Sequence, residues 1–171
     1  MKIADFINAT RRYWRVLLAA IACVVALAVA PTYGASEAAL SPVGDWITPD
    51  PETGKPRSIV RIEAQGEVLI GRVIKGLSGH DRPGSVCSLC VDDRKGQPLL
   101  GMDIIRDARK SESESELQWF GEILDPSTGK SFKLRLRMVD DGKTLELRAY
   151  KGSPMFGRTI EWQRQLSGSD L

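Results

Sequence analysis

The sequence predicts an all-β protein: an eight-stranded antiparallel up-and-down barrel, preceded by an N-terminal signal helix. Three observations support this prediction. Apolar and charged side chains alternate with a period of two after Val43, turn residues separate the alternating stretches, and no convincing amphipathic helix follows. A sheet with one apolar face must cover that face, and no predicted helix does so. Closure of the sheet into a barrel is therefore the economical solution.

Residues 1–36 are interpreted as a bacterial secretory signal peptide with a short linker. Basic residues precede an apolar run over residues 16–30, and the chain becomes small and polar after Pro31. The run has 15 residues, fewer than the ~20 that a membrane-spanning helix needs. A cleaved signal is therefore favoured over a retained anchor, and no stable membrane span is expected after cleavage. The basic residues are Lys2, Arg11, Arg12 and Arg15.

Cleavage is expected after Gly34, Ser36 or Ala38, where the residues are small. The Sec route is favoured over the twin-arginine route, because the residues after Arg11-Arg12 depart from the twin-arginine pattern. Cys23 is interpreted as part of the signal, since the apolar run continues beyond it instead of ending there. The expected location is the periplasm or the extracellular space.

Removal of the signal changes the charge of the chain. The full sequence has 24 Lys and Arg against 22 Asp and Glu, and residues 1–36 hold four of the basic and one of the acidic side chains. The mature chain then has 20 basic and 21 acidic side chains, a formal charge of −1, so a nucleic acid is not an expected partner. Its length suits one domain, expected over residues 42–165, with a flexible tail over 166–171.

The early strands are expected over residues 43–48, 58–63, 67–74 and 101–107, and the last over 155–164. Gly66 marks the turn between the second and third strands. Residues 75–98, which are rich in Gly, Pro and Cys, are expected to form a long loop. Residues 107–116, which are acidic and contain serines, are expected to form a solvated loop.

Two hairpins in the second half of the chain have a predictable register. A turn centred on Asp141-Gly142 places apolar residues opposite one another on one face and an Arg opposite a Glu on the other. A slip of one residue would spoil all of these pairings. The expected pairs are Met138 with Leu145, Leu136 with Leu147 and Arg137 with Glu146. Through the turn at residues 125–130, they are Ile123 with Phe132, Glu122 with Lys133 and Trp119 with Leu136.

The apolar face of these hairpins supplies candidate ligand-binding residues. An eight-stranded barrel has an interior large enough for packed side chains or for one small ligand. The expected ligand is a small lipophilic molecule, and the expected lining residues are Trp119, Ile123, Phe132, Leu134, Leu136, Met138, Leu145 and Leu147.

Gly44-Asp45-Trp46 begins the first expected strand, and this Gly-x-Trp resembles the opening signature of lipocalins and related barrels. The resemblance implies that Trp46 closes the barrel floor and that an Arg of the last strand lies across its ring, in a cation–π contact. Arg158 and Arg164 are the two candidates for that contact.

The order of further motifs resembles domain-of-unknown-function family 2147 over about residues 42–164. The resemblance implies an exported bacterial protein with a lipocalin-like barrel and implies no activity. Ala149 departs from the pattern, in which Gly more often precedes the Tyr. Among the matching motifs are Gly44-Asp45-Trp46, Cys87-Ser88-Leu89-Cys90, Trp119-Phe120-Gly121-Glu122, Leu145-Glu146-Leu147-Arg148 and Phe156-Gly157-Arg158-Thr159.

Cys87 and Cys90 have three interpretations. In an oxidising compartment they are expected to form a disulfide, although a bridge around a loop of four residues contributes only ~2 kcal/mol. A thiol-redox pair is the second interpretation, without the strand-to-helix context that lowers a thiolate pKa. A metal site completed by nearby acidic residues and a histidine is the third, without a second Cys-x-x-Cys. Those additional candidate ligands are His80, Asp81, Asp92 and Asp93.

Three classes of function therefore remain open: a small-molecule binding protein, an envelope interaction protein with a solid core, and a redox or metal protein acting through Cys87 and Cys90. No catalytic residue, cofactor or resident metal is predicted. His80, the single histidine, has no neighbouring nucleophile and orienting partner. The sequence makes no prediction of oligomeric state.

Overall fold

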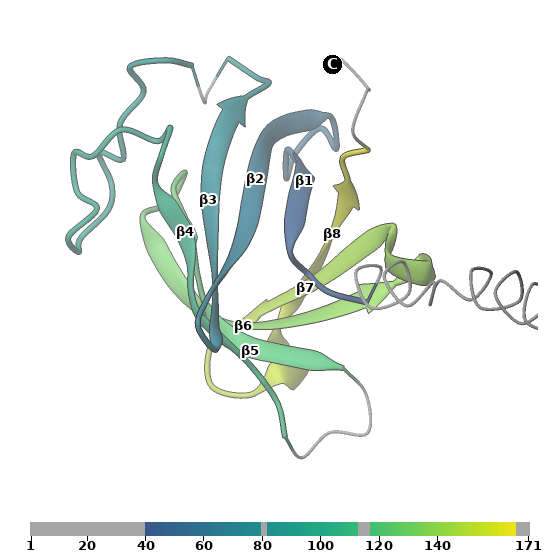
Figure 1. The fold of residues 1–171 in the computed structure, drawn as a ribbon. Coiled ribbons are helices and arrows are strands. Elements are labelled where there is room, and N and C mark those ends of the chain that lie inside the picture. The colour runs from purple at the N-terminus through teal and green to yellow at the C-terminus, as the bar shows by residue number, and fades with distance from the viewer. Residues whose placement is uncertain (1–39, 80–81, 113–116, 167–171) are drawn as a thin grey trace, which may run out of the picture. The chain divides into compact units, whose positions relative to one another are not determined.

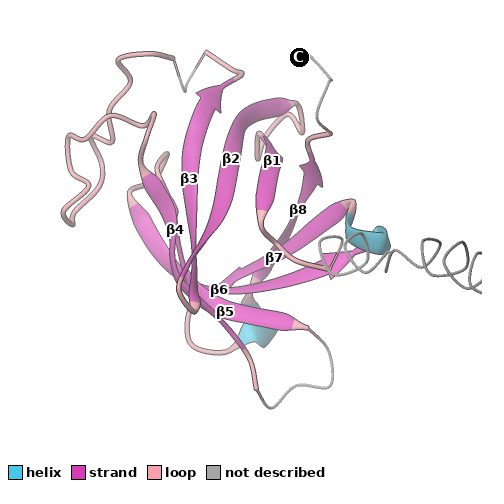
Figure 2. Cartoon of the chain, viewed as in Figure 1, coloured by secondary structure: helices cyan, strands magenta, loops and turns pink. Residues whose placement is uncertain are grey.

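The computed structural model describes residues 40–79, 82–112 and 117–166, and these form one closed barrel (Figure 1). Figure 2 shows that strands dominate it and that the helices of the described residues are two short 3₁₀ turns, η1 (Asp140–Gly142) and η2 (Pro154–Phe156). The strands, in chain order and in ring order, are β1 (Gly44–Pro49), β2 (Pro56–Gln65), β3 (Val68–Gly76), β4 (Asp103–Lys110), β5 (Gln118–Asp125), β6 (Lys130–Val139), β7 (Thr144–Tyr150) and β8 (Arg158–Arg164).

Each strand pairs antiparallel with the next, and the ring closes where β1 meets β8 through the pairs Trp46↔Arg164 and Ile47↔Gln163. The prediction of an eight-stranded antiparallel up-and-down barrel is confirmed. The expected signal peptide and Cys23 lie outside the described residues. Among the residues that the structure does describe, no helix has the length and apolar character needed to cross a bilayer.

The predicted registers of the β5–β6 and β6–β7 hairpins are confirmed at every pair. The turn between β6 and β7 differs from the expectation of a two-residue turn. Residues 140–143 form a longer connection containing η1, in which Asp140 and Asp141 both have φ of 52°. The register survives because this longer connection is still centred on Asp141-Gly142.

Two predicted boundaries are wrong. Strand β4 continues to Lys110, so residues 107–110 are not part of a solvated loop. Asp107, with φ of 52°, lies at a register shift between β4 and β5, and the strand continues beyond it with Ala108 fully buried. The last strand begins at Arg158, because the preceding residues form η2, whose Pro154 and Met155 carbonyls accept hydrogen bonds from the guanidinium of Arg148.

The inward rows of the strands pack into one apolar core. It is densest toward the end of the barrel that carries the β2–β3, β4–β5 and β6–β7 connections, called here the closed end. The other end carries the β1–β2, β3–β4, β5–β6 and β7–β8 connections and is called the mouth. Fully buried side chains of the core are Trp46, Val60, Ile62, Ile105, Leu134, Leu136, Leu145 and Leu147.

Close packing of β4 against β5 predicts that Gly121→Ala is strongly destabilising. A Cβ on Gly121 would lie 2.6 Å from the Ala108 Cα and 2.7 Å from the Arg106 carbonyl oxygen, both of which are backbone atoms. We expect a loss of about 2–3 kcal/mol of unfolding free energy, measured by denaturant titration. Gly66→Ala is the control, because Gly66 has φ of 63° and open space around it. It should cost about 1 kcal/mol, and an equal loss in both variants would contradict the packing explanation.

Candidate functional site

A cavity of about 830 Å³ opens at the mouth of the barrel. Its volume lies within the range of about 300–1,000 Å³ that is usual for small-molecule sites. Its apolar lining comes mainly from β3 to β8 and the β3–β4 connection. Polar residues also line it, and two of them, Thr48 of β1 and Ser58 of β2, are buried and hydrogen-bonded to each other. Besides three prolines, the apolar lining residues are Val73, Leu99, Ile104, Ile123, Leu124, Phe132, Ala149, Ile160 and Trp162.

The structure places the eight sequence-predicted lining residues in two groups. Ile123 and Phe132, which are cross-strand partners near the mouth, line the cavity. The other six fill the core toward the closed end: Trp119, Leu134, Leu136, Leu145 and Leu147 are buried there, and Met138 packs against them partly buried. Position along the strand therefore separates cavity from core within the same inward rows.

Several lining residues were not among the candidates. Ile160 and Trp162 follow Arg158 at every second position of β8, and this alternation is a signal that could have placed both in an inward row. Leu99 belongs to the β3–β4 connection, where no period of two exists to indicate its burial. Its contribution to the cavity depends on how that connection folds against the barrel.

Two aspartates at the rim of the cavity hold the turns that surround it. The carboxylate of Asp125 accepts hydrogen bonds from the Ser127 N–H and hydroxyl and from the Thr128 hydroxyl. The carboxylate of Asp50 accepts hydrogen bonds from the Thr53 N–H and hydroxyl, and these bonds lower the pKa of Asp50. Both are short-range Asx-type arrangements that shape a turn.

The closed end is covered by a cation–π contact. The guanidinium of Arg164 lies 4.3 Å from the centroid of the Trp46 ring, and the indole N–H of Trp46 donates to the Pro42 carbonyl at 2.8 Å. Burial lowers the pKa of Arg164. Of the two arginines that the sequence offered for this contact, Arg164 makes it, while Arg158 lies at the mouth and lines the cavity.

A disulfide joins Cys87 and Cys90 in the β3–β4 connection. Both residues are only 1% exposed, and thiol–disulfide exchange requires access to a sulfur. The burial favours a bridge that shapes this connection over a redox pair. The connection also lies tightly against the β5–β6 turn, since a Cβ on Gly129 would clash with the backbone of Leu89.

The described residues contain no group of three metal-ligating side chains. Of the candidate ligands near the disulfide, His80 and Asp81 lie outside the described residues. Asp92 and Asp93 instead form ion pairs with Arg94 and Arg106. These two carboxylates are therefore engaged by guanidinium groups in the structure.

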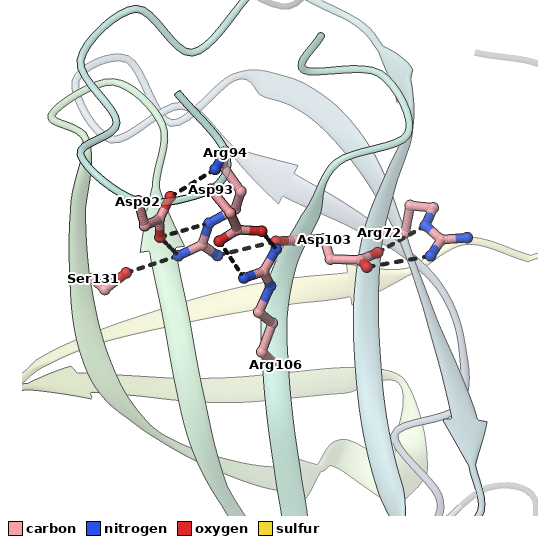
Figure 3. A network of polar contacts seen from close by, with 7 residues as sticks. All are labelled: Arg72, Asp92, Asp93, Arg94, Asp103, Arg106 and Ser131. Carbon is pink, nitrogen blue, oxygen red and sulfur yellow. Dashed lines mark hydrogen bonds and ion pairs between the residues drawn. The ribbon is translucent and has the colours of Figure 1, made fainter. Parts of the chain in front are cut away.

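Arg94 anchors the β3–β4 connection to the barrel (Figure 3). Its side chain is buried, with the residue 4% exposed, and it forms an ion pair with Asp92. It also donates to the Asp103 carbonyl of β4 at 3.1 Å and to the Ser131 hydroxyl of β6 at 3.0 Å. Beside it, Arg106 forms an ion pair with Asp93. One arginine thus joins the connection to two strands at the mouth.

A closed eight-stranded up-and-down barrel, with a packed floor and an apolar cavity at its mouth, defines a lipocalin-like protein. The fold is similar to a solved structure described as "Protein HP1028 from the human pathogen Helicobacter pylori belongs to the lipocalin family". The TM-score is 0.63 at 18% identity, over 75% of this chain and 85% of that chain. A family model described as "Uncharacterized protein conserved in bacteria (DUF2147)" matches residues 44–164, so the chain belongs to this family. No curated protein matches the chain.

The Asp92–Arg94 pair predicts an acid-sensitive contribution to stability. Hydrogen bonding by Arg94 lowers the pKa of Asp92 from an ordinary 3.8 to about 2. Because the folded pKa lies below the unfolded one, the contribution is complete above about pH 4 and is lost as the pH falls toward 2. For a carboxylate that is about a third exposed, we expect about 1 kcal/mol after allowing for solvent screening.

The measurement is the unfolding free energy between pH 2 and pH 6 for the wild type, Asp92→Asn and Arg94→Met. The difference between the wild type and each variant should shrink as the pH falls through this window. A difference that stays constant over the whole range would contradict the assignment.

Proposed function

We propose that this protein is exported from the bacterial cytoplasm and binds one small lipophilic molecule in the cavity at the barrel mouth. The observation that supports binding is the cavity itself: about 830 Å³ of space lined mainly by apolar side chains, in a barrel whose other end is packed. Transfer of apolar surface from water into such a space is favourable. A site of this volume suits one drug-sized ligand.

Support for export comes from the sequence. Residues 1–36 combine basic residues, a short apolar run and small residues in the order of a secretory signal. A buried Cys87–Cys90 disulfide is compatible with an oxidising compartment, where such bonds persist.

A second candidate function is interaction with another envelope protein through the β3–β4 connection. Exposed apolar side chains on this connection favour it, namely Val86, Leu89 and Val91. The binding function ranks first because the cavity is one continuous space with a mainly apolar lining, whereas these exposed residues alternate along the chain with the buried cysteines. Failure of neutral probes to enter the barrel would reverse this order.

Partial filling of the cavity should weaken uptake of a neutral lipophilic probe. Ala149 lies on the inward row of β7 and lines the cavity, so Ala149→Phe should occupy part of the space. We expect at least about a tenfold weaker binding of N-phenyl-1-naphthylamine, followed by its fluorescence.

Ala64→Phe is the matched control, since Ala64 is exposed on β2 and does not line the cavity. It should bind the probe as the wild type does. Thermal unfolding of both variants checks that the barrel is intact. Equal probe binding by wild type and Ala149→Phe would place the probe elsewhere and contradict the proposal.

Export predicts a shortened protein in the envelope fraction. When the full chain is expressed in a bacterium, mass spectrometry of the osmotic-shock fraction should show an N-terminus that begins after Gly34, Ser36 or Ala38. Deletion of residues 16–30 should keep the protein in the cytoplasm, because the apolar run is the part that the export machinery recognises. An uncleaved chain in the cytoplasm would contradict export.

A further inference from the structure

Two arginines occupy the inward row of β8, one near each end. Alternation along the strand places Arg158, Ile160, Trp162 and Arg164 on the same face, and Trp162 is buried in the core. Arg164 lies against Trp46 at the closed end, while Arg158 lines the cavity at the mouth. One strand thus places a guanidinium group at each end of the barrel interior.

The two guanidinium groups differ in their partners. Arg164 donates to the carbonyl oxygens of Ser41, Val43 and Gly142 at 2.6–3.0 Å. Arg158 donates to one carbonyl oxygen, that of Pro51, at 3.3 Å. A guanidinium has five N–H donors, and no carboxylate within the described residues forms an ion pair with Arg158. Donors of Arg158 therefore remain for another acceptor at the mouth.

The acidic residues that line the cavity, Asp50, Asp125 and Glu161, form no ion pair with Arg158. Asp50 and Asp125 are engaged by the hydrogen bonds of their own turns. Glu161 stands opposite Glu146 of β7, in the row of β8 that alternates with the inward one. Arg57 also lines the cavity, and its charge acts on Asp50, where it helps to lower the pKa of that carboxyl. Arg158 thus lies at the edge of the cavity without a carboxylate bound to its guanidinium, and its spare donors are the feature that a ligand head group could use.

We infer that the ligand is an amphipathic anion with one apolar tail and a carboxylate head group, and that Arg158 binds this head group at the mouth. The inference rests on the proposed binding function and specifies its ligand class. A guanidinium binds a carboxylate through two parallel N–H···O hydrogen bonds. Ile160 and Trp162, which follow Arg158 along the inward row, then contact the tail.

The experiment compares ligands that share a tail and differ in the head group. Dodecanoate and dodecanol each displace N-phenyl-1-naphthylamine from the protein purified from the envelope fraction, and the ratio of their affinities is measured. A charged hydrogen-bonded contact predicts that the wild type binds dodecanoate about tenfold more tightly than dodecanol. In Arg158→Met the affinity ratio should fall to about one. In Arg158→Lys, which keeps the positive charge but not the two parallel N–H donors, the ratio should be intermediate.

Arg109→Met is the matched control for the loss of one positive charge. Arg109 lies near the closed end, where it pairs with Val68 of β3, and it does not line the cavity. This variant should keep the preference of the wild type. Thermal unfolding of every variant establishes that the barrel remains folded, and Arg158→Lys serves as the test if Arg158→Met does not fold.

The outcomes separate the inference from the function on which it rests. If neither the neutral probe nor dodecanol binds the wild type, the proposed binding function fails. If both bind but dodecanoate has no advantage, or its advantage survives in Arg158→Met, the head-group inference is overturned while the binding function stands. An equal loss of preference in Arg109→Met would assign the effect to net charge and would also overturn the role of Arg158.

Discussion

The barrel depends on the contact that closes it, between β1 and β8. These strands share only the pairs Trp46↔Arg164 and Ile47↔Gln163, whereas β1 and β2 pair along the whole of β1. Arg164 reinforces this short ladder, because its guanidinium bonds three carbonyl oxygens and covers the Trp46 ring. A ring of strands has no free edge only while this contact holds. The enclosed core, and the cavity above it, follow from closure.

The interior of the barrel has two regions, a packed floor and a cavity at the mouth. Toward the floor, Leu136, Leu145 and Leu147 are fully buried and exclude solvent. Toward the mouth, Ile123, Phe132 and Ala149 are only half-buried and line the cavity. The same alternation produces both regions, because every inward row runs from one end to the other. Stability and the proposed binding are therefore assigned to different parts of the same strands.

Features that depend on segments close in the chain, such as hairpin registers, could be predicted from the sequence. Features that depend on contacts between distant segments could not. The hairpin registers were predictable, because turn residues and cross-strand pairs such as Arg137 with Glu146 lie close in the chain. Strand β4 was predicted too short, since a polar residue such as Asp107 at a register shift looks like the start of a loop. The division between core and cavity depends on depth along the barrel, which alternation does not report. The Arg94 anchor reaches Ser131, 37 residues further along the chain, and begins in a connection without strand alternation, so no local pattern indicates it.

Separation of Arg164 from the cavity has a consequence for how such a protein changes over time. Residues at the mouth, such as Ala149, can be exchanged for larger or smaller ones while the β1–β8 ladder and its Trp46 contact stay untouched. If the cavity binds a ligand as proposed, its volume and shape can change under selection for a new ligand. One inherited frame would then serve a series of chemically different cargoes, each defined by a few side chains around the opening.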